Sequence, residues 1–314
     1  MGTSRENIIR GPGAVKLGSV QIYDKDGIDS ALVPTGFKVM VSAIGEVDTK
    51  LEDAIGETGF TPSGRVTAAL LAALYPYGNP TYGADIFGAS DVVCEIHSLL
   101  GKKVAWTASA LTKMPQLRLS AKQTLFGDCQ ISHVIGNGMN RRTANSLFEV
   151  SDETFAGAYD KADVHCKAVS AAWGSDSPWD AIRTKDGWMI DFEPTFDRVF
   201  DDEEGTIGMQ ITGITARAKC TPQGLNEAQI LAALNSQGTG HGIGDSIRTG
   251  DDLVLTGPAG GGVTVTLKDA ALVQGPLQWG NDKLRNGELG WEAHRSISSG
   301  IGGAIFTVAM TPDP

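Results

Sequence analysis

Residues 209–222 read MQITGITARAKCTP, and this stretch decides the fold class. Met209 and Ile211 alternate with polar residues, and from Ile214 onwards the apolar side chains follow the opposite parity. Because successive side chains of a strand point to opposite faces, a change of parity requires one additional residue. Gly213 stands at this change. The stretch therefore predicts a long β-strand with a β-bulge at Gly213.

A similar stretch occurs 160 residues earlier, as part of a longer repeat. Aligning residues 22–131 with residues 182–291 without a gap makes about a fifth of the positions identical, whereas unrelated chains of ordinary composition match at roughly 6% of positions. Lys25-Asp26-Gly27 falls on Lys185-Asp186-Gly187. In the first copy, Asp53 takes the bulge position. The alignment predicts that each half of the chain repeats the structure of the other.

The repeat places a domain boundary near the middle of the chain. A chain of 314 residues is long enough for two domains. We expect a first domain at residues 1–155, a second domain at residues 156–314, and a connector at about 153–178. The last strands of the two copies, 147–150 and 305–308, align at a spacing of 158.

Turn and cap residues predict how each domain is built. Each Lys-Asp-Gly predicts a tight turn between paired strands, since glycine accepts a positive φ. Thr61-Pro62 predicts the start of a helix with Thr as N-cap, and Thr221-Pro222 does the same in the second copy. An apolar stripe at helical spacing follows in the first copy, at Val66, Leu70, Leu71 and Leu74. The predicted fold is mainly β with short helices: two tandem antiparallel β-sandwich or barrel domains, each with one flanking α-helix.

Composition excludes several classes of function. The net charge of −11 disfavours a protein that grips nucleic-acid phosphates, because such binding needs clustered Lys and Arg. The four cysteines form no CxxC pair, which disfavours a zinc or redox site and suits a reducing cytoplasm. Cys94 and Cys220 are predicted to be buried apolar residues. Residues 1–12 contain no apolar signal-peptide core, and no apolar run is long enough to span a membrane.

Motifs for catalysis or cofactor binding are weak. The glycine-rich run 257–262 lacks the Lys-Ser/Thr of a phosphate-binding loop and precedes a predicted strand. His241, Asp245 and Ser246 are close in sequence, but the first copy has neither the His nor the Ser, so a loop is expected. We therefore predict no catalytic residue, no cofactor and no metal, and the chain is not expected to be an enzyme.

Acidic residues gather around the predicted long strands. Asp201 to Glu204 precede the bulged strand of the second copy, and acidic residues also surround the first bulge. Their spacing does not fit a calcium-binding loop, so a solvated hairpin tip is expected.

The chain resembles the major tail tube proteins of long-tailed, non-contractile bacteriophages. The resemblance rests on Asn7-Ile8-Ile9-Arg10-Gly11-Pro12-Gly13-Ala14-Val15, on Thr-Pro-x-Gly, and on the final Ala304-Ile305-Phe306-Thr307-Val308. It implies a β-sandwich-like domain that forms six-station rings, and the rings stack into a tube. With two domains per chain, the resemblance implies trimeric rings with pseudo-sixfold symmetry, which also suits head-to-tail closure.

The resemblance also implies partners and a location. The expected partners are further copies of the chain, the tape-measure, tail terminator and distal tail proteins, and viral DNA that passes through the lumen without specific binding. No membrane partner is expected. The expected location is the virion tail, assembled in the host cytoplasm. A ring of three chains carries three times the charge of one, and an acidic lumen would repel DNA. The candidate ring-stacking or lumen residues are Glu46, Asp48, Glu52, Asp53, Asp201, Asp202, Glu203, Glu204 and Gly213.

Three other classes remain open from the sequence. The first is a related ring protein, such as a tail terminator, a baseplate ring or a secretion-system tube. The second is a two-domain β enzyme with a site between the halves, and the third is a two-domain carbohydrate-binding or adhesion module. The third class favours exposed aromatic side chains, whereas most tryptophans here lie in strand-like contexts where burial is expected.

Overall fold

The computed structural model describes residues 14–41, 45–64, 66–87, 94–97, 102–106, 109–120, 124–134, 149–152, 169–174, 182–201, 205–222, 229, 245–246, 250–257, 262–274, 277–279, 284–295 and 303–311. Within these residues the fold is mainly β, and every pairing between named strands is antiparallel. Among the same residues, no helix has the length and apolarity that crossing a membrane would require.

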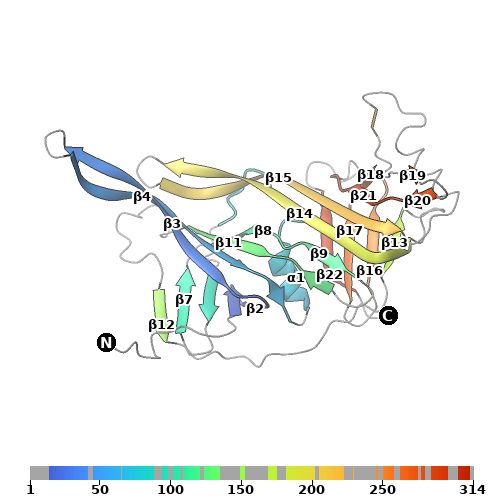
Figure 1. Ribbon diagram of the computed structural model, residues 1–314, viewed down its shortest axis with the longest axis horizontal. Coiled ribbons are helices and arrows are strands. Elements are labelled where there is room, and N and C mark those ends of the chain that lie inside the picture. Colours follow the sequence, from blue (N-terminus) through green and yellow to red (C-terminus); the bar gives the residue numbers. More distant parts are fainter. Residues whose placement is uncertain are drawn as a thin grey trace.

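The first half of the chain contributes two sheets (Figure 1). The strand order in one sheet is β12 (Glu149–Asp152), β7 (Lys102–Trp106), β6 (Cys94–His97), β1 (Ala14–Leu17), β2 (Val20–Asp24) and β5 (Pro62–Ser63). The order in the other is β3 (Asp29–Val41), β4 (Gly45–Phe60), β11 (Cys129–Val134) and β8 (Ser109–Lys113). The helix α1 (Ala68–Leu74) follows β5 in the chain.

The second half contributes the remaining sheets. One has the order β13 (Ser170–Trp173), β16 (Leu253–Thr256), β17 (Val263–Leu267) and β22 (Phe306–Met310). Another contains β14 (Thr184–Asp201), β15 (Gly205–Pro222), β21 (Leu289–Glu292) and β18 (Ala271–Gln274), and two first-half strands, β10 (Thr124–Phe126) and β9 (Leu117–Leu119), extend it beyond β14. A two-stranded sheet pairs β19 (Leu277–Trp279) with β20 (Leu284–Asn286).

The two halves repeat the same order of strands. The order β3-β4-β11-β8 recurs as β14-β15-β21-β18, and β1-β6-β7-β12 recurs as β13-β16-β17-β22. The residue register recurs as well, because Asp29 lies opposite Gly59 while Met189 lies opposite Lys219. Each of these residue numbers differs from its counterpart by 160. The spacing found in the sequence therefore describes paired strands and not only similar residues.

Both long hairpins carry two β-bulges, and the bulges also recur at a spacing of 160. In β4 the residues left without an opposite partner are Glu52 and Val47, and in β15 they are Thr212 and Ile207. The predicted bulges at Asp53 and Gly213 are thus confirmed to within one residue. At Gly213 a Cβ atom would meet only Thr195, at 3.5 Å, so this bulge does not require glycine.

The predicted tight turn at Lys-Asp-Gly is wrong. Strand β2 pairs with β1 and β5, whereas β3 pairs with β4, so the chain crosses between sheets at Gly27 instead of forming a hairpin. In the second half, Gly187 lies inside β14 at an irregularity of the pairing. Both glycines nevertheless have a positive φ, 115° at Gly27 and 87° at Gly187. The backbone therefore bends at this motif, and the positive φ of the bend favours glycine.

The predicted start of the first helix is also wrong. The helix begins after Thr67, whose Oγ1 accepts a hydrogen bond from the N–H of Leu70 at 3.1 Å. Thr61 is engaged elsewhere, since its N–H donates to Asp24 at 3.1 Å and its hydroxyl donates to Asp128 at 2.7 Å. The apolar stripe is confirmed, because Leu70, Leu71 and Leu74 are buried. The helix predicted after Thr221-Pro222 lies outside the described residues, except for Gln229.

In the β6–β7 hairpin the repeat shifts by one residue. Cys94 lies opposite Trp106, and Leu253 lies opposite Leu267. All four side chains are buried, so the equivalent positions are 159 apart in β6 and 161 apart in β7. With that shift, Glu149 opposite Ala105 corresponds to Thr307 opposite Thr266, which confirms the spacing of 158 in the last strand.

Most buried apolar side chains form one cluster that includes residues of both halves. The ring of Tyr75, just after α1, lies 4.9 Å from the ring of Phe192 on β14. Phe192 in turn lies 4.4 Å from Phe306 on β22. The first-half helix is therefore packed on second-half strands, and burial of these rings holds the halves together. Of the tryptophans, Trp106, Trp173, Trp188 and Trp291 are buried, as the sequence predicted.

Candidate assembly surfaces

The two long hairpins, β3–β4 and β14–β15, project to the same side of the molecule (left in Figure 1). Both are far longer than the usual strand of about five or six residues. The acidic residues of the first hairpin are spread along it: Glu46 lies opposite Met40 near the end, whereas Asp53 lies opposite Thr35 farther back. Asp48 lies between them, and Glu52 is a bulge residue. A single acidic tip is therefore wrong for this hairpin.

In the second hairpin, Asp201 is the last residue of β14 and lies opposite Gly205. Asp202, Glu203 and Glu204 lie outside the described residues. Gly213 lies well back from the hairpin end, opposite Thr195. The sequence-predicted residues thus occupy two hairpins, and the backbone places them at several levels along each hairpin instead of at one cluster.

The first contact between the halves is a strand addition. Strand β9 of the first half pairs with the outer edge of β14, and the register sets Leu119 opposite Trp188 and Leu117 opposite Ile190. All four of these side chains are nearly inaccessible to solvent. The backbones approach closely, because a Cβ at Gly187 would lie 2.2 Å from the carbonyl oxygen of Leu119. Glycine at this position therefore allows β9 to dock.

The second contact runs along β15. The backbone of Gly83 to Ile86 exchanges hydrogen bonds with Met209 and Ile211, including Ile86 N–H to Met209 oxygen at 2.8 Å. The Asp85 carboxylate accepts hydrogen bonds from the N–H groups of Met209 and Phe87, each at 3.2 Å. A side chain at Gly208 would contact it tightly, since a Cβ there would lie 3.0 Å from Asp85 Oδ2.

The third contact joins the turn after α1 to the last strand. The carbonyl oxygen of Gly78 accepts a hydrogen bond from Ile305 N–H at 2.8 Å. Tyr77 packs edge-on against Phe196 with 5.6 Å between ring centroids, and its hydroxyl donates to Leu111 oxygen at 2.7 Å. In all three contacts, first-half residues that come after β5 in the chain meet strands of the second half. The interface is therefore head-to-tail, because different surfaces meet.

A buried polar chain lies inside the first half. His133 on β11 is inaccessible to solvent, and its ring nitrogens lie 2.7 Å from Ser109 Oγ and 2.8 Å from Thr58 Oγ1. The Ser109 hydroxyl also lies 3.4 Å from the carbonyl oxygen of Trp106. The ring stacks on Trp106 at 4.8 Å. Burial lowers the pKa of His133 to about 3.

The same positions in the second half are apolar. The equivalents of Thr58, Ser109 and His133 are the buried residues Ala218, Ala270 and Ala293. The fold therefore accepts either a satisfied polar chain or a set of small apolar side chains at this place. A buried histidine with a lowered pKa is a candidate for catalysis. Here its partners are two hydroxyls in the interior, which indicates a structural role.

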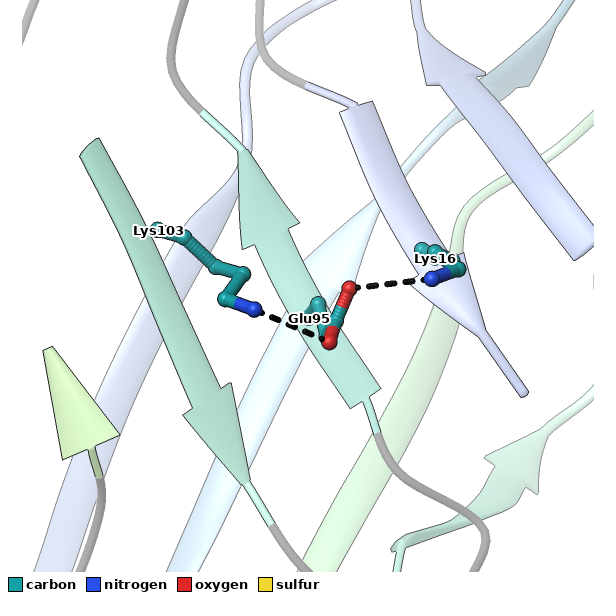
Figure 2. Close-up of polar contacts among 3 residues, drawn as sticks. All are labelled: Lys16, Glu95 and Lys103. Atoms are coloured by element: carbon teal, nitrogen blue, oxygen red, sulfur yellow. Dashed lines mark hydrogen bonds and ion pairs between the residues drawn. The ribbon is translucent and has the colours of Figure 1, made fainter. Parts of the chain in front are cut away.

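An ion-pair network lies on the sheet that contains β1, β6 and β7. Figure 2 shows the Glu95 carboxylate between two ammonium groups, with Lys16 and Lys103 each 3.3 Å away. The three residues come from three adjacent strands, so the network ties the sheet together across two pairings. Glu95 and Lys103 are shielded while Lys16 is more exposed. Such partly exposed pairs stabilise by only about 1 kcal/mol or less each.

The described residues offer no reactive thiol. Burial raises the pKa of the Cys94 and Cys220 thiols to about 12, and it also raises the pKa of Cys129. These side chains are buried, as the sequence predicted for Cys94 and Cys220. Among the described residues, no group of three or more His, Cys, Asp and Glu side chains could hold a metal ion. Asp245 and Ser246 are exposed, and His241 lies outside the described residues.

Sequence reasoning missed the strand addition of β9 and the helix contact with β22. The available signals were the repeated Leu117 and Leu277, the repeated Gly127 and Gly287, and the repeated Lys-Asp-Gly. No protein-family model matches the chain, and no curated protein matches its sequence. The candidate site is accordingly defined by geometry: the three contacts between the halves and the two long hairpins.

Proposed function

We propose that this chain is a structural subunit that assembles with copies of itself into rings, and that the rings stack into a bacteriophage tail tube. In this proposal residues 1–155 and 156–314 are two tube domains, each an antiparallel sandwich with a flanking helix. Three chains supply six stations, so the ring is a trimer with pseudo-sixfold symmetry. The tube belongs to the virion tail, and its partners are the tape-measure, terminator and distal tail proteins.

The observation that carries the proposal is the repeated pairing. The long hairpins of the two halves share one register and the same two bulges. A chain built this way presents the same strand arrangement twice, and the halves meet through unlike surfaces. A head-to-tail contact generates a closed ring when its rotation divides the circle, and an open filament when it does not. The internal contact is therefore a template for contacts between chains.

The projecting hairpins support stacking of the rings. A hairpin that extends beyond its sheet leaves strand edges uncovered, and natural proteins cover or protect such edges. Contact with a neighbouring ring would cover them. The net charge of −11 fits a conduit for DNA, because an acidic wall repels phosphate groups instead of holding them. A basic lumen in an assembled tube would refute this part of the proposal.

Negative-stain electron microscopy of the purified chain tests the proposal directly. We expect rings or tubes whose class averages show six densities around a lumen, and a ring mass of three chains by native mass spectrometry. Monodisperse single chains at every concentration and ionic strength would contradict it. Rings that never stack would indicate a terminator or baseplate ring instead of a tube.

Replacing the acidic run Asp201 to Glu204 with serine tests the hairpin assignment. We expect shorter tubes or isolated rings, and an unchanged thermal unfolding midpoint. The matched control is Glu193→Ser, which removes an exposed carboxylate from the middle of the same strand and is expected to leave tube length unchanged. Gly213→Ala is also expected to fold, because the space beside Gly213 accepts a Cβ. Tubes of normal length from the Asp201 to Glu204 variant would refute the assignment.

A further inference from the structure

We propose that the β19–β20 hairpin of one chain adds to the outer edge of β3 in the next chain of the ring. The register would set Trp279 opposite Ile28, Gln278 opposite Asp29, and Leu277 opposite Ser30 of the neighbour. This inference rests on the proposed self-assembly, and it names the contact that makes it. Its basis is the contact of β9 with β14 inside one chain. The counterparts of these strands are β19 and β3, so the same contact between two chains would join β19 to β3.

The β19–β20 hairpin has the same register as the β9–β10 hairpin. Leu277 lies opposite Asn286 and Trp279 opposite Leu284, whereas Leu117 lies opposite Phe126 and Leu119 opposite Thr124. All residue numbers differ by 160. Each inner strand also alternates in the same way, Leu-Arg-Leu in β9 and Leu-Gln-Trp in β19. The second hairpin therefore has the shape and the side-chain pattern needed for the same addition.

The two hairpins differ in what they pair with. Strand β9 extends a larger sheet through β14, whereas β19 and β20 pair only with each other among the described residues. An isolated two-stranded hairpin is at best marginally stable in water. The Leu-x-Leu face of β9 is fully buried in the internal contact. A partner strand would therefore stabilise β19–β20 through backbone hydrogen bonds.

The edge that receives the hairpin is available on β3. Strand β3 is the counterpart of β14, and within the described residues it pairs with β4 alone. Asp29 and Ser30 are exposed, and Ile28 is only partly covered. The counterparts of Ile28 and Ser30 are Trp188 and Ile190, which are buried beside β9, whereas Met189, the counterpart of Asp29, is exposed. Among the described residues, no strand therefore pairs with the edge of β3 that corresponds to the β9-covered edge of β14.

Gly27 provides an independent observation. Gly187 is its counterpart, and there the carbonyl of Leu119 fills the space that a Cβ would need. Beside Gly27, no atom of the described residues other than its chain neighbours lies within 4 Å of the corresponding position. Both glycines have a positive φ, so the backbone is bent in the same way at both sites. The open space at Gly27 is the place that the carbonyl of a neighbour's Trp279 would occupy.

The equivalence of positions between the halves favours repetition of the strand addition between chains, and it disfavours repetition of the contact along β15. In the contact along β15, Asp85 lies close to Gly208, where a Cβ would be 3.0 Å from Asp85 Oδ2. The counterpart of Gly208 is Asp48, and the counterpart of Asp85 is Asp245. Repeating that contact between chains would bring two carboxylates together, which is electrostatically unfavourable. The strand addition meets no such obstacle.

A disulfide cross-link tests the register. The variant is Asp29→Cys with Gln278→Cys in the full chain, oxidised at concentrations where particles form and separated on a non-reducing gel. We expect links between chains, a ladder that ends at the covalent trimer, and, by mass spectrometry, a disulfide-linked peptide pair that joins positions 29 and 278. The matched control is Arg118→Cys with Met189→Cys, which lie opposite each other in β9 and β14 and should link within one chain.

The natural cysteines give little background in this experiment. Cys94, Cys129 and Cys220 are buried and free. Cys166 lies outside the described residues, and it is replaced by serine in both the test variant and the control. A link between chains in the test variant therefore reports the two introduced thiols.

Hydrogen exchange of the wild-type chain gives a reading that needs no substitution. On assembly we expect exchange at Ile28 to Ser30 and at Leu277 to Trp279 to slow by about tenfold or more. Particles with neither the cross-link nor this protection would overturn the inference and leave the proposed function standing. Cross-linked open chains without rings or tubes would support the strand addition and contradict the proposed function.

Discussion

Acidification from pH 7.5 to pH 4.5 is expected to destabilise the chain through one residue, His133. Both ring nitrogens bind hydroxyls in the interior, and burial lowers the pKa of the folded state to about 3. In the unfolded chain histidine titrates near pH 6.5. Below pH 6.5 the unfolded state therefore binds a proton that the folded state does not. The stability contributed by neutral His133 is complete above pH 6.5 and declines as the pH falls towards 3.

The size of the effect follows from these two pKa values. Each pH unit between them changes the free energy of unfolding by about 1.4 kcal/mol. At pH 4.5, two units below the pKa of the unfolded state, the expected loss is about 3 kcal/mol. This is a large fraction of the stability of a typical domain, about 5–15 kcal/mol.

The assay compares the wild type with a variant that carries the second-half residues at this place. The variant combines Thr58→Ala, Ser109→Ala and His133→Ala, matching Ala218, Ala270 and Ala293. Urea unfolding at both pH values gives the free-energy difference between the two chains, and other titrating groups cancel. We expect the difference to move by about 3 kcal/mol in favour of the variant at pH 4.5. A difference that does not change with pH would refute the reasoning.

Three further outcomes are expected. Gly187→Ala should lower the unfolding midpoint more than Gly27→Ala, because both strain a positive φ but only the first meets a carbonyl oxygen; equal midpoints in isolated chains would contradict this. Gly56→Ala should cost about 1–3 kcal/mol in urea unfolding, because its Cβ would lie 2.9 Å from the Trp106 ring. Leu74→Ala should cost about 2–5 kcal/mol and preserve a single calorimetric transition, since the halves share one core; two separated transitions would contradict the shared core.

Much of the local structure could be predicted from residue patterns. The parity change around Gly213 located a bulge within one residue, because side-chain alternation is a property of the strand itself. The helical stripe Leu70, Leu71 and Leu74 was also correct. The helix start was not, because Thr61 has its hydrogen-bond partner on Asp128, a residue distant in sequence. Turn and cap residues report local preference, and long-range partners can override that preference.

The candidate surfaces show the same division. The acidic residues and the bulges were visible in the sequence, but their levels along each hairpin depend on the pairing register. The Lys-Asp-Gly motif indicated a bend, and the sequence could not say that β9 would lie against one copy of it. Repetition at 160 residues gave the equivalence of positions. It did not give the contacts, since identical strands can meet different neighbours.

The sequence by itself determined the β-rich class, the repeat and its register, because these depend on alternation and on residue identity at fixed spacing. Only the tertiary structure decided that α1 packs on β22 and that β9 extends the sheet of the other half. It also decided that, among the described residues, β3 pairs only with β4, and β19 pairs only with β20. The physical reason is that strand edges and apolar faces are not specific to one partner. Which strand pairs with which edge depends on how the whole chain packs around its core.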